Sequence, residues 1–203
     1  MEILPVRGEL MNGRFGHTVT LINDMFVIAF GGASGNDKRF TITNDTLMFD
    51  TNALSWAPLH SEGISPTPRA AHAACGVYSS QMVIYGGAVG GGSLAPEDLY
   101  LLDLDNQTRC TWERVIVSGK TPGKRYGHTM TFSKPYLIVH GGNSGNDVLG
   151  DSWLLNLEES VLKWTELQID GPSPSPRVYH SAALCPIGTA AGMIIVYGGR
   201  NGS

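Results

Sequence analysis

Residues 26–32 read Phe-Val-Ile-Ala-Phe-Gly-Gly, an apolar run that ends in two glycines. Similar runs end at three later glycine pairs, in steps of 55, 55 and 57 residues. The four pairs are Gly31 and Gly32, Gly86 and Gly87, Gly141 and Gly142, and Gly198 and Gly199. A run of this length fits a β-strand buried on both faces, whereas a bilayer-spanning helix needs about 20 apolar residues. The fixed period indicates one structural unit used several times.

Two further elements recur with the same period. An Arg-x-x-His element precedes each apolar run, and a single tryptophan follows each of the first three glycine pairs. The Arg and His residues are Arg14 and His17, Arg69 and His72, Arg125 and His128, and Arg177 and His180. The tryptophans are Trp56, Trp112 and Trp164. Because these elements keep one order, the repeat extends over nearly the whole chain.

Each repeat reads as four short β-strands. In the first repeat, residues 17–22 alternate in polarity, residues 25–30 are apolar, a third strand follows Asp45, and a fourth carries Trp56. Four antiparallel strands repeated at about 50 residues indicate a blade of a β-propeller, so we expect an all-β fold. We expect the paired glycines to supply backbone dihedrals that side chains forbid, and the tryptophans to fill the space between blades.

These repeated elements resemble the kelch-repeat family across essentially the whole chain. A narrower resemblance, to the N-terminal kelch region of the kelch-type serine/threonine protein phosphatases of plants and apicomplexan parasites, rests on four stretches. They are SPTPRAAH (65–72), GGAVGGGSLAPEDLYLLDL (86–104), PGKRYGH (122–128) and GGNSGNDVLGDSWLLNL (141–157). That family joins such a propeller to a C-terminal metallophosphatase domain. The resemblance implies that two divalent metals belong to that domain and that this segment carries no cofactor.

The catalytic motifs of that phosphatase domain do not occur in this sequence. Its G-D-x-H-G, G-D-x-x-D-R-G and G-N-H-E elements would supply the metal ligands, but the Gly-Asp pair at 150–151 continues Ser-Trp, and the Gly-Asn pairs at 35–36 and 145–146 do not continue His-Glu. No catalytic residue is therefore carried over, and we predict that this segment is not itself an enzyme.

The repeat predicts a partial kelch-type propeller of about 3.5 four-stranded blades. The predicted segments are an outer strand or exit loop of a neighbouring blade at 1–13, blades at 14–68, 69–124 and 125–176, and the first two strands of a further blade at 177–203. Since propellers close with about 4–8 blades, we expect the remaining blades in the parent chain. We also expect the isolated segment to self-associate through its uncovered blade face and strand edges.

Composition excludes several classes of protein. A net charge of −4 argues against bulk nucleic-acid binding, and the sequence contains neither a membrane-spanning run nor a visible signal peptide. Cys75, Cys110 and Cys185 form no close-spaced pattern, which favours free thiols in a reducing compartment. We therefore expect an intracellular protein, cytoplasmic or nuclear, that binds neither nucleic acid nor membranes.

The repeated polar residues are interpreted as structural. The four histidines occupy equivalent places, one per blade, and we expect hydrogen bonds at strand starts rather than a metal site. The four arginines are expected to join adjacent loops through their five donors, with partner contact as a second role. Asp45, Asp98 and Asp151 are interpreted as turn acceptors rather than general acids.

The parity of the strands places the long connections on one face of the propeller. The long connections would lie there, with nine basic residues against six acidic ones: residues 33–44, 88–97, 143–150 and 200–203, together with 61–69, 118–125 and 171–177. We expect this face to bind an acidic or phosphorylated protein segment. The predicted contact residues are Ser34, Asn36, Lys38, Arg39, Lys124, Asn143, Ser144, Asn146 and Arg200.

Three functions fit the sequence. The first is a protein-interaction module that recruits substrates to a serine/threonine phosphatase whose catalytic domain lies outside this segment. The second is a kelch substrate adaptor for ubiquitin ligation or a cytoskeletal scaffold. The third, a propeller enzyme, would need a nonrepeated cluster of acids, Tyr, Cys or His on the long loops, and the sequence offers none.

Overall fold

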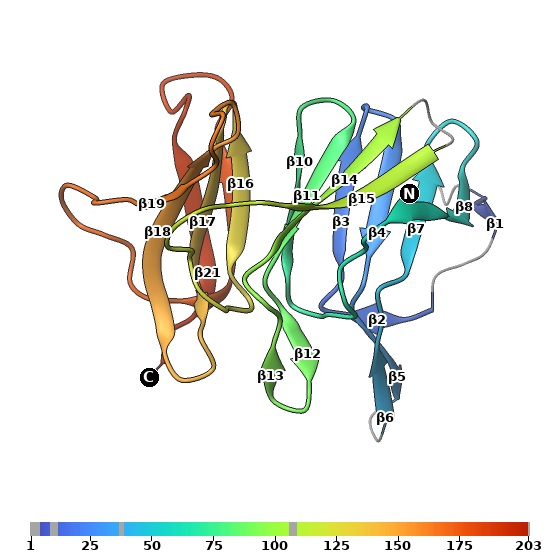
Figure 1. The fold of residues 1–203 in the computed structure, drawn as a ribbon, viewed down its shortest axis with the longest axis horizontal. Helices are drawn as coiled ribbons and strands as arrows, with labels where there is room; N and C mark the ends of the chain where they lie inside the picture. The colour runs from blue at the N-terminus through green and yellow to red at the C-terminus, as the bar shows by residue number, and fades with distance from the viewer. Residues whose placement is uncertain (1–4, 9–11, 37–38, 106–108, 203) are drawn as a thin grey trace.

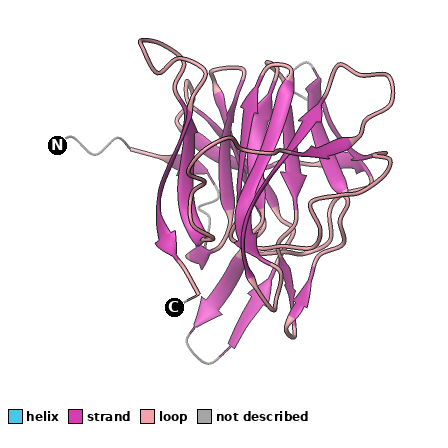
Figure 2. Ribbon diagram, turned by 90° about the vertical axis from the view of Figure 1, so that its left-hand side faces the viewer, coloured by secondary structure: helices cyan, strands magenta, loops and turns pink. Residues whose placement is uncertain are grey.

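The computed structural model describes residues 5–8, 12–36, 39–105 and 109–202. This part of the chain forms six β-sheets, of which the four that contain the repeated strands stand side by side (Figure 1). This part of the chain contains strands, turns and loops and no helix, as Figure 2 shows from the side. It accordingly has no helix that could cross a membrane. The prediction of an all-β fold is confirmed.

The first two sheets each contain the four strands expected of a blade. The first sheet holds β3 (Thr18–Ile22), β4 (Phe26–Phe30), β7 (Thr46–Asp50) and β8 (Ser55–Pro58), in that order. The second holds β10 (Ala73–Val77), β11 (Gln81–Tyr85), β14 (Leu99–Asp105) and β15 (Arg109–Val115). Within each set of four, neighbouring strands are antiparallel, so each set is a meander.

The third and fourth sheets follow the same order. The third holds β16 (Thr129–Ser133), β17 (Tyr136–Asn143), β18 (Val148–Asn156) and β19 (Trp164–Glu166). The fourth pairs β20 (Val178–Leu184) with β21 (Ile194–Arg200). The first strands of adjacent sheets contact one another, β3 with β10, β10 with β16 and β16 with β20, so the sheets succeed each other as propeller blades. The predicted partial propeller is confirmed.

Two β-hairpins project from one end of the sheets, at the bottom of Figure 1. One is formed by β5 (Ala33–Asn36) and β6 (Arg39–Ile42), with β2 (Arg14–Phe15) paired to β5. The other is formed by β12 (Ala88–Gly90) and β13 (Ser93–Leu94). The sequence predicted irregular loops at these positions, because four residues or fewer per strand give little alternation to read.

A short parallel strand extends the outer edge of the first two blades. β1 (Arg7–Gly8) pairs with β8, and β9 (Ser61–Gly63) pairs with β15. In both cases a glycine lies opposite the blade tryptophan, Gly8 opposite Trp56 and Gly63 opposite Trp112. The segment that leaves one blade thus adds to the sheet of the next, although the sequence division groups Ser61–Gly63 with the first blade.

The hydrophobic core lies between neighbouring blades. The ring of Trp112 in the second blade is centred 5.3 Å from that of Phe30 in the first, and the ring of Trp164 in the third lies 5.9 Å from that of Tyr85 in the second. Both tryptophans are buried, as predicted for residues that fill the space between blades. Trp56 contacts Phe49 of its own blade and is half-buried.

The paired glycines fit the space where the next blade begins. Gly86 has φ of 67°, and a Cβ built there would lie 2.5 Å from the backbone oxygen of Arg125 in the third blade. Gly31 and Gly141 meet Arg69 and Arg177 in the same way. The positive φ expected of these glycines is present, and the close approach of the next blade leaves no room for a side chain.

Candidate functional site

Each repeated arginine after Arg14 connects two blades. Its side-chain Nη1 donates to the carbonyl of the first glycine in its own blade, for example from Arg69 to Gly86 at 3.0 Å and from Arg125 to Gly141 at 2.9 Å. Its backbone carbonyl accepts from the second glycine of the preceding blade, as Arg69 does from Gly32 at 2.8 Å. Arg69, Arg125 and Arg177 therefore fix the long-loop ends of successive blades to one another.

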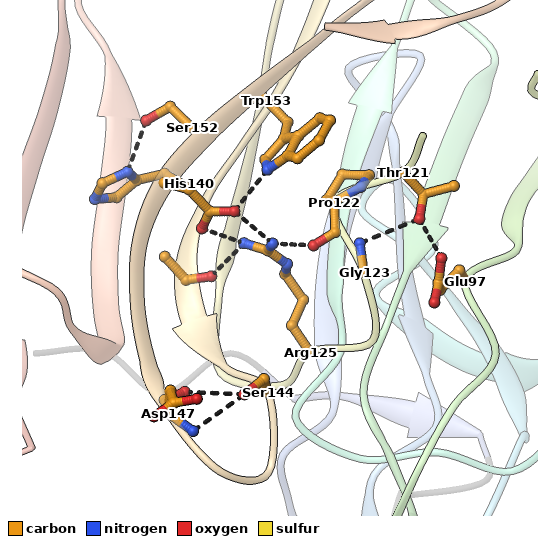
Figure 3. A network of polar contacts seen from close by, with 12 residues as sticks. Glu97, Thr121, Pro122, Gly123, Arg125, His140, Ser144, Asp147, Ser152 and Trp153 are labelled. Atoms are coloured by element: carbon orange, nitrogen blue, oxygen red, sulfur yellow. Dashed lines mark hydrogen bonds and ion pairs between the residues drawn. The ribbon is translucent and has the colours of Figure 1, made fainter. Parts of the chain in front are cut away.

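Asp151 is an ion-pair partner of Arg125, whose polar contacts Figure 3 shows. Its carboxylate accepts two hydrogen bonds from Arg125, at 2.9 and 2.8 Å, and a third from Trp153 Nε1 at 2.6 Å. Burial opposes ionisation, but the hydrogen bonds and the charge of Arg125 together lower the pKa of Asp151 below its ordinary value. Asp151 lies within β18, and its carboxylate binds the arginine and the tryptophan of its own blade, contacts that the interpretation as a turn acceptor did not include.

The other two aspartates differ from Asp151. Asp45 makes a 3.4 Å ion pair with Arg14, and Thr43 also hydrogen-bonds to its carboxylate. Asp98 pairs with Arg114 at 3.6 Å instead of with the arginine of the repeat. Arg69 lies over the ring of Tyr100, 5.3 Å from its centre.

These internal contacts remove four basic groups from the predicted basic face. Arg69 and Arg125 are 0% and 1% exposed, and the Arg14 side chain is 5% exposed. Arg177 is half-buried and donates to Ser175 and Gly198. The exposed positive charge at this end of the described chain rests on Arg39, Lys120, Lys124 and Arg200.

The histidines hydrogen-bond across the blade interfaces. His72 Nε2 lies 2.8 Å from Thr18 Oγ1 of the first blade, and His180 Nε2 lies 2.9 Å from Thr129 Oγ1 of the third. The equivalent partner of His128 in the second blade would be residue 73, but that residue is an alanine and has no hydroxyl group. Neither ring nitrogen of His128 has a partner among the described residues, although the side chain is 5% exposed.

Burial keeps these imidazoles neutral. It lowers the pKa of His72 to about 3, with Arg69 and His17 adding to the effect. Burial, together with Arg125, lowers the pKa of His128 well below its ordinary value. Among the described residues, no group of three or more His, Cys, Asp or Glu side chains could hold a metal ion.

A chain of backbone hydrogen bonds passes from blade to blade beside the histidines. The second residue after each arginine has positive φ, and its N–H donates to the equivalent carbonyl of the preceding blade. The bonds run from Ala71 to Gly16 at 2.7 Å, from Gly127 to Ala71 at 2.8 Å and from Tyr179 to Gly127 at 2.8 Å. Through these bonds, the starts of the first strands of the four blades lie around one common centre.

A cavity of about 920 Å³ opens where these strand starts converge. All four repeated histidines line it, together with both projecting hairpins. Its aromatic lining consists of Phe15, Phe40, Tyr126 and Tyr179. Phe15 and Phe40 are each 60% exposed and Tyr179 is 57% exposed, so the cavity presents apolar rings to an incoming molecule.

The sequence interpretation missed these aromatic residues. Phe15, Tyr126 and Tyr179 lie between the arginine and the histidine of their repeats, in Arg-Phe-Gly-His, Arg-Tyr-Gly-His and Arg-Val-Tyr-His. The signal available in the sequence was that the residues between the arginine and the histidine vary, although the arginine and the histidine themselves are constant. Positions that vary inside a repeat and face the centre of a propeller can differ without disturbing the fold.

The predicted contact residues of the first blade lie on the β5–β6 hairpin. Ser34 and Asn36 are in β5, and Arg39 is exposed in β6, where its N–H donates to Asn36 Oδ1 at 3.1 Å. Lys38 lies outside the described residues. The hairpin also contributes Phe40 and Ile42 to the cavity, so this part of the prediction adjoins the site.

The other predicted contact residues lie on later blades. Asn143 ends β17, and its Oδ1 accepts from the N–H of Gly145 at 2.7 Å. Ser144 and Asn146 lie in the turn between β17 and β18, where Ser144 binds Asp147 (Figure 3). The exposed Lys124 precedes Arg125, and Arg200 ends β21. The predicted residues are therefore spread over successive blades along one end of the molecule, and their binding role stays a prediction.

The cysteines are free thiols. Cys110 Sγ–H donates to the carbonyl of His60 at 3.1 Å, and burial raises the pKa of the Cys75 thiol to about 12. A thiol with so high a pKa is a poor nucleophile at neutral pH. None of the three lines the cavity.

Known proteins share this repeat. The chain matches the KLHDC2/KLHL20/DRC7 Kelch-repeats domain over residues 4–203. It is 38% identical over 160 residues to Serine/threonine-protein phosphatase BSL2 of Arabidopsis thaliana, covering 78% of this chain and 15% of that protein. It is 32% identical over 208 residues to F-box/kelch-repeat protein At1g51550 of the same plant, covering 97% of this chain and 42% of that protein.

A further plant relative is Adagio protein 3 of Arabidopsis thaliana, 32% identical over 198 residues, which cover 92% of this chain and 30% of that protein. The chain thus spans less than half the length of each of these relatives. What the relatives have in common with this chain is the repeat region.

Proposed function

The chain belongs to the kelch-repeat family, and from that premise we propose that it is a protein-interaction module that binds a partner at the cavity-bearing end. The observation that carries this proposal is the cavity of about 920 Å³ at the convergence of four blades. Its walls are rigid strand starts fixed by the arginine and backbone contacts, and its rim consists of two projecting hairpins. A preformed concave surface of this kind reduces the ordering cost of binding.

The chemistry of the site favours a segment that combines an apolar side chain with negative charge. Phe15, Phe40 and Tyr179 offer exposed rings that an apolar side chain can pack against. Arg39, Lys124 and Arg200 are exposed at the same end and attract carboxylates or phosphates. We therefore propose that the ligand is an acidic or phosphorylated protein segment.

The parent protein that we favour is a serine/threonine phosphatase, in which this module recruits phosphoprotein substrates. The 38% identity to a protein named as such a phosphatase supports this proposal. Catalysis would belong to a domain outside this sequence, with its two divalent metals.

A substrate adaptor is the second candidate. It is supported by the F-box/kelch-repeat protein, whose match covers 97% of this chain. Both candidates use the same binding end. The complete coding sequence distinguishes them, since a metallophosphatase domain supports the first and an F-box or BTB-type domain supports the second.

The binding proposal is tested with a phosphoserine-containing peptide library and its unphosphorylated counterpart. Peptides selected on the wild-type chain are measured against the triple variant Arg39→Ala, Lys124→Ala, Arg200→Ala. We expect about tenfold weaker binding, roughly 1.4 kcal/mol, and a smaller salt dependence, because three exposed charges are lost. A matched control is Arg109→Ala, an exposed arginine at the start of β15 and away from the cavity. Equal affinity of the triple variant and the control would refute the assignment of the charged contacts.

The aromatic contribution is tested separately. Replacement of the exposed Phe40 by Ala is expected to weaken binding of the same peptides by at least tenfold, because an aromatic anchor is removed from the cavity. Val161→Ala, an exposed apolar residue between β18 and β19, is the control. Peptides that bind both variants equally would place the ligand elsewhere on the chain.

A further inference from the structure

One position of the repeat carries a small residue in three blades and a tyrosine in the fourth. It is the second residue after the repeated arginine, which in chain order is Gly16, Ala71, Gly127 and Tyr179. Its φ lies between 54° and 66° in all four blades. Positive φ brings a side chain close to the backbone, so Tyr179 holds a conformation that a glycine would adopt without strain. Strain held at one member of a repeat points to a role of that side chain beyond the fold.

The ring of Tyr179 lies against the third blade. The N–H of Tyr179 donates to the carbonyl of Gly127 at 2.8 Å, and a Cβ built on Gly127 would lie 3.0 Å from Cδ1 of the tyrosine ring. The ring of Tyr126 is centred 5.9 Å from that of Tyr179, and both tyrosines line the cavity. All of these contacts are made between the third and fourth blades, within the chain.

A second aromatic pair lines the cavity from the first blade. The rings of Phe15 and Phe40 are centred 5.7 Å apart and meet edge to face, at an interplanar angle of 70°. In the second blade, the residue equivalent to Phe15 and Tyr126 is Ala70, which also lines the cavity. Its small side chain leaves space between the two aromatic pairs.

The interior of the cavity carries no charge at neutral pH in the part of the chain that the structure describes. None of the described lining residues is Asp, Glu, Lys or Arg. The lining histidines are neutral, mainly because burial lowers the pKa of each one: that of His72 to about 3, that of His180 to about 4, and those of His17 and His128 below their ordinary value. A charged side chain would therefore lose its hydration in this cavity without gaining a partner of opposite charge.

Positive charge lies at the edge of the cavity instead. Arg200 is opposite Val178 in the β20–β21 pair, one residue before Tyr179, and its charge is close enough to favour the ionised form of the Tyr179 phenol. The edge therefore suits an acidic group, while a lysine or arginine of the partner would meet like charge there.

We propose that the cavity takes a neutral aromatic side chain of the partner, from a tryptophan, phenylalanine or tyrosine, between the two aromatic pairs, and that Tyr179 determines this specificity. The inference rests on the proposed function, because it names the side chain that the acidic or phosphorylated segment inserts. Rings gain from edge-to-face and offset contacts with other rings, which an aliphatic side chain does not make. We expect an aromatic side chain to bind about three- to tenfold more tightly than leucine.

Three small probes test the preference on the full chain: N-acetyltryptophanamide, N-acetylleucinamide and N-acetyllysinamide. Each is titrated while the backbone amide shifts are followed by NMR. Tryptophanamide should shift residues 15–17, 126–128 and 179–180 and bind about three- to tenfold more tightly than leucinamide, and lysinamide should leave these shifts unchanged. The proposal is overturned if lysinamide binds as tightly as tryptophanamide, or if tryptophanamide shifts none of these residues.

The role of Tyr179 is tested by Tyr179→Gly. This variant should bind tryptophanamide at least fivefold more weakly, yet keep a Tm within about 3 °C of wild type, since glycine relieves the positive φ. Tyr78→Gly is the matched control, because Tyr78 also has positive φ, 54°, but lies at the opposite end of the strands. Tyr179→Ala, which places in the fourth blade the residue found at this position in the second, gives the same test if the glycine variant does not fold. Equal affinities of the Tyr179 and Tyr78 variants for tryptophanamide would exclude Tyr179 as the determinant.

Peptides selected from the phosphoserine library separate this proposal from the proposed function. Peptides that shift only residues away from the cavity, while tryptophanamide still shifts its lining, would refute the proposed function alone. Peptides that shift the cavity lining but bind equally well after their aromatic residue is changed to lysine would overturn the aromatic preference alone.

Discussion

The replacement Ala73→Thr supplies the hydroxyl group that His128 lacks. Thr18 and Thr129 bond the histidine of the following blade at 2.8 and 2.9 Å, and Ala73 is the residue at their position in the second blade. The backbone arrangement is the same at each junction, since the N–H of Gly127 donates to Ala71 just as Ala71 donates to Gly16. A threonine at position 73 should therefore place its Oγ1 beside His128 Nε2.

The expected gain follows from the burial of His128. A neutral hydrogen bond contributes about 1 kcal/mol, and an unpaired buried polar group costs about 1–3 kcal/mol. Against Ala73→Val, which has the same shape without the hydroxyl, we expect Ala73→Thr to be more stable by about 1–2 kcal/mol. For a chain of this size that corresponds to a Tm difference of about 2–8 °C.

Thermal and urea unfolding of the Thr and Val variants measure this difference. The comparison is repeated in a His128→Leu background, where the threonine should lose its advantage because its partner is gone. The reasoning is refuted if the valine variant is as stable as the threonine variant. It is also refuted if the advantage of threonine persists without His128.

Three further predictions concern the same interfaces. As pH falls from 7.5 to 5.5, His72 should lower the free energy of unfolding by about 1.4 kcal/mol. The histidine of the unfolded chain gains a proton near pH 6.5, whereas the folded one stays neutral until about pH 3. Urea titrations at the two pH values should show a smaller drop for His72→Gln. Gly86→Ala should destabilise by at least about 2 kcal/mol through positive φ and the nearby carbonyl, and Gly198→Ala by only about 1 kcal/mol, as measured by thermal unfolding of dilute protein. Arg125→Met should cost about 3–5 kcal/mol because it leaves the half-buried Asp151 carboxylate unpaired, and Asp151→Asn in the same chain should restore part of that loss in urea unfolding.

Each of these predictions has a contrary result. A pH profile unchanged by His72→Gln would mean that another group controls acid stability. Equal losses for Gly86→Ala and Gly198→Ala would contradict the close approach of the next blade. A double variant at Arg125 and Asp151 that is no more stable than the single one would show that the ion pair is not the main contribution of Arg125.

The strands could be predicted from the sequence because a repeat averages out local ambiguity. The apolar run before Gly31 is equally compatible with a helix segment, but its recurrence before Gly86, Gly141 and Gly198 leaves a β-blade as the consistent interpretation. The inter-blade positions of Trp112 and Trp164 followed from the same period.

The cavity could not be predicted in this way. It arises only when four strand starts converge, so Phe15 and Tyr179 become neighbours of one space although more than 160 residues separate them. Whether each arginine is exposed or buried also depends on tertiary contacts. Counting Arg69 and Arg125 as surface charge overestimated the basic face, because both guanidinium groups are buried against backbone carbonyls.

Hydrogen exchange of the chain with and without a peptide selected from the phosphoserine library tests most directly whether the cavity-bearing end is the binding surface. We predict increased protection at residues 15–17, 40–42, 88–94 and 126–128, which line the cavity. The turns at 78–80 and 133–136, at the opposite ends of the strands, should exchange as before. Protection of those turns, with the cavity segments unchanged, would contradict the proposed binding surface.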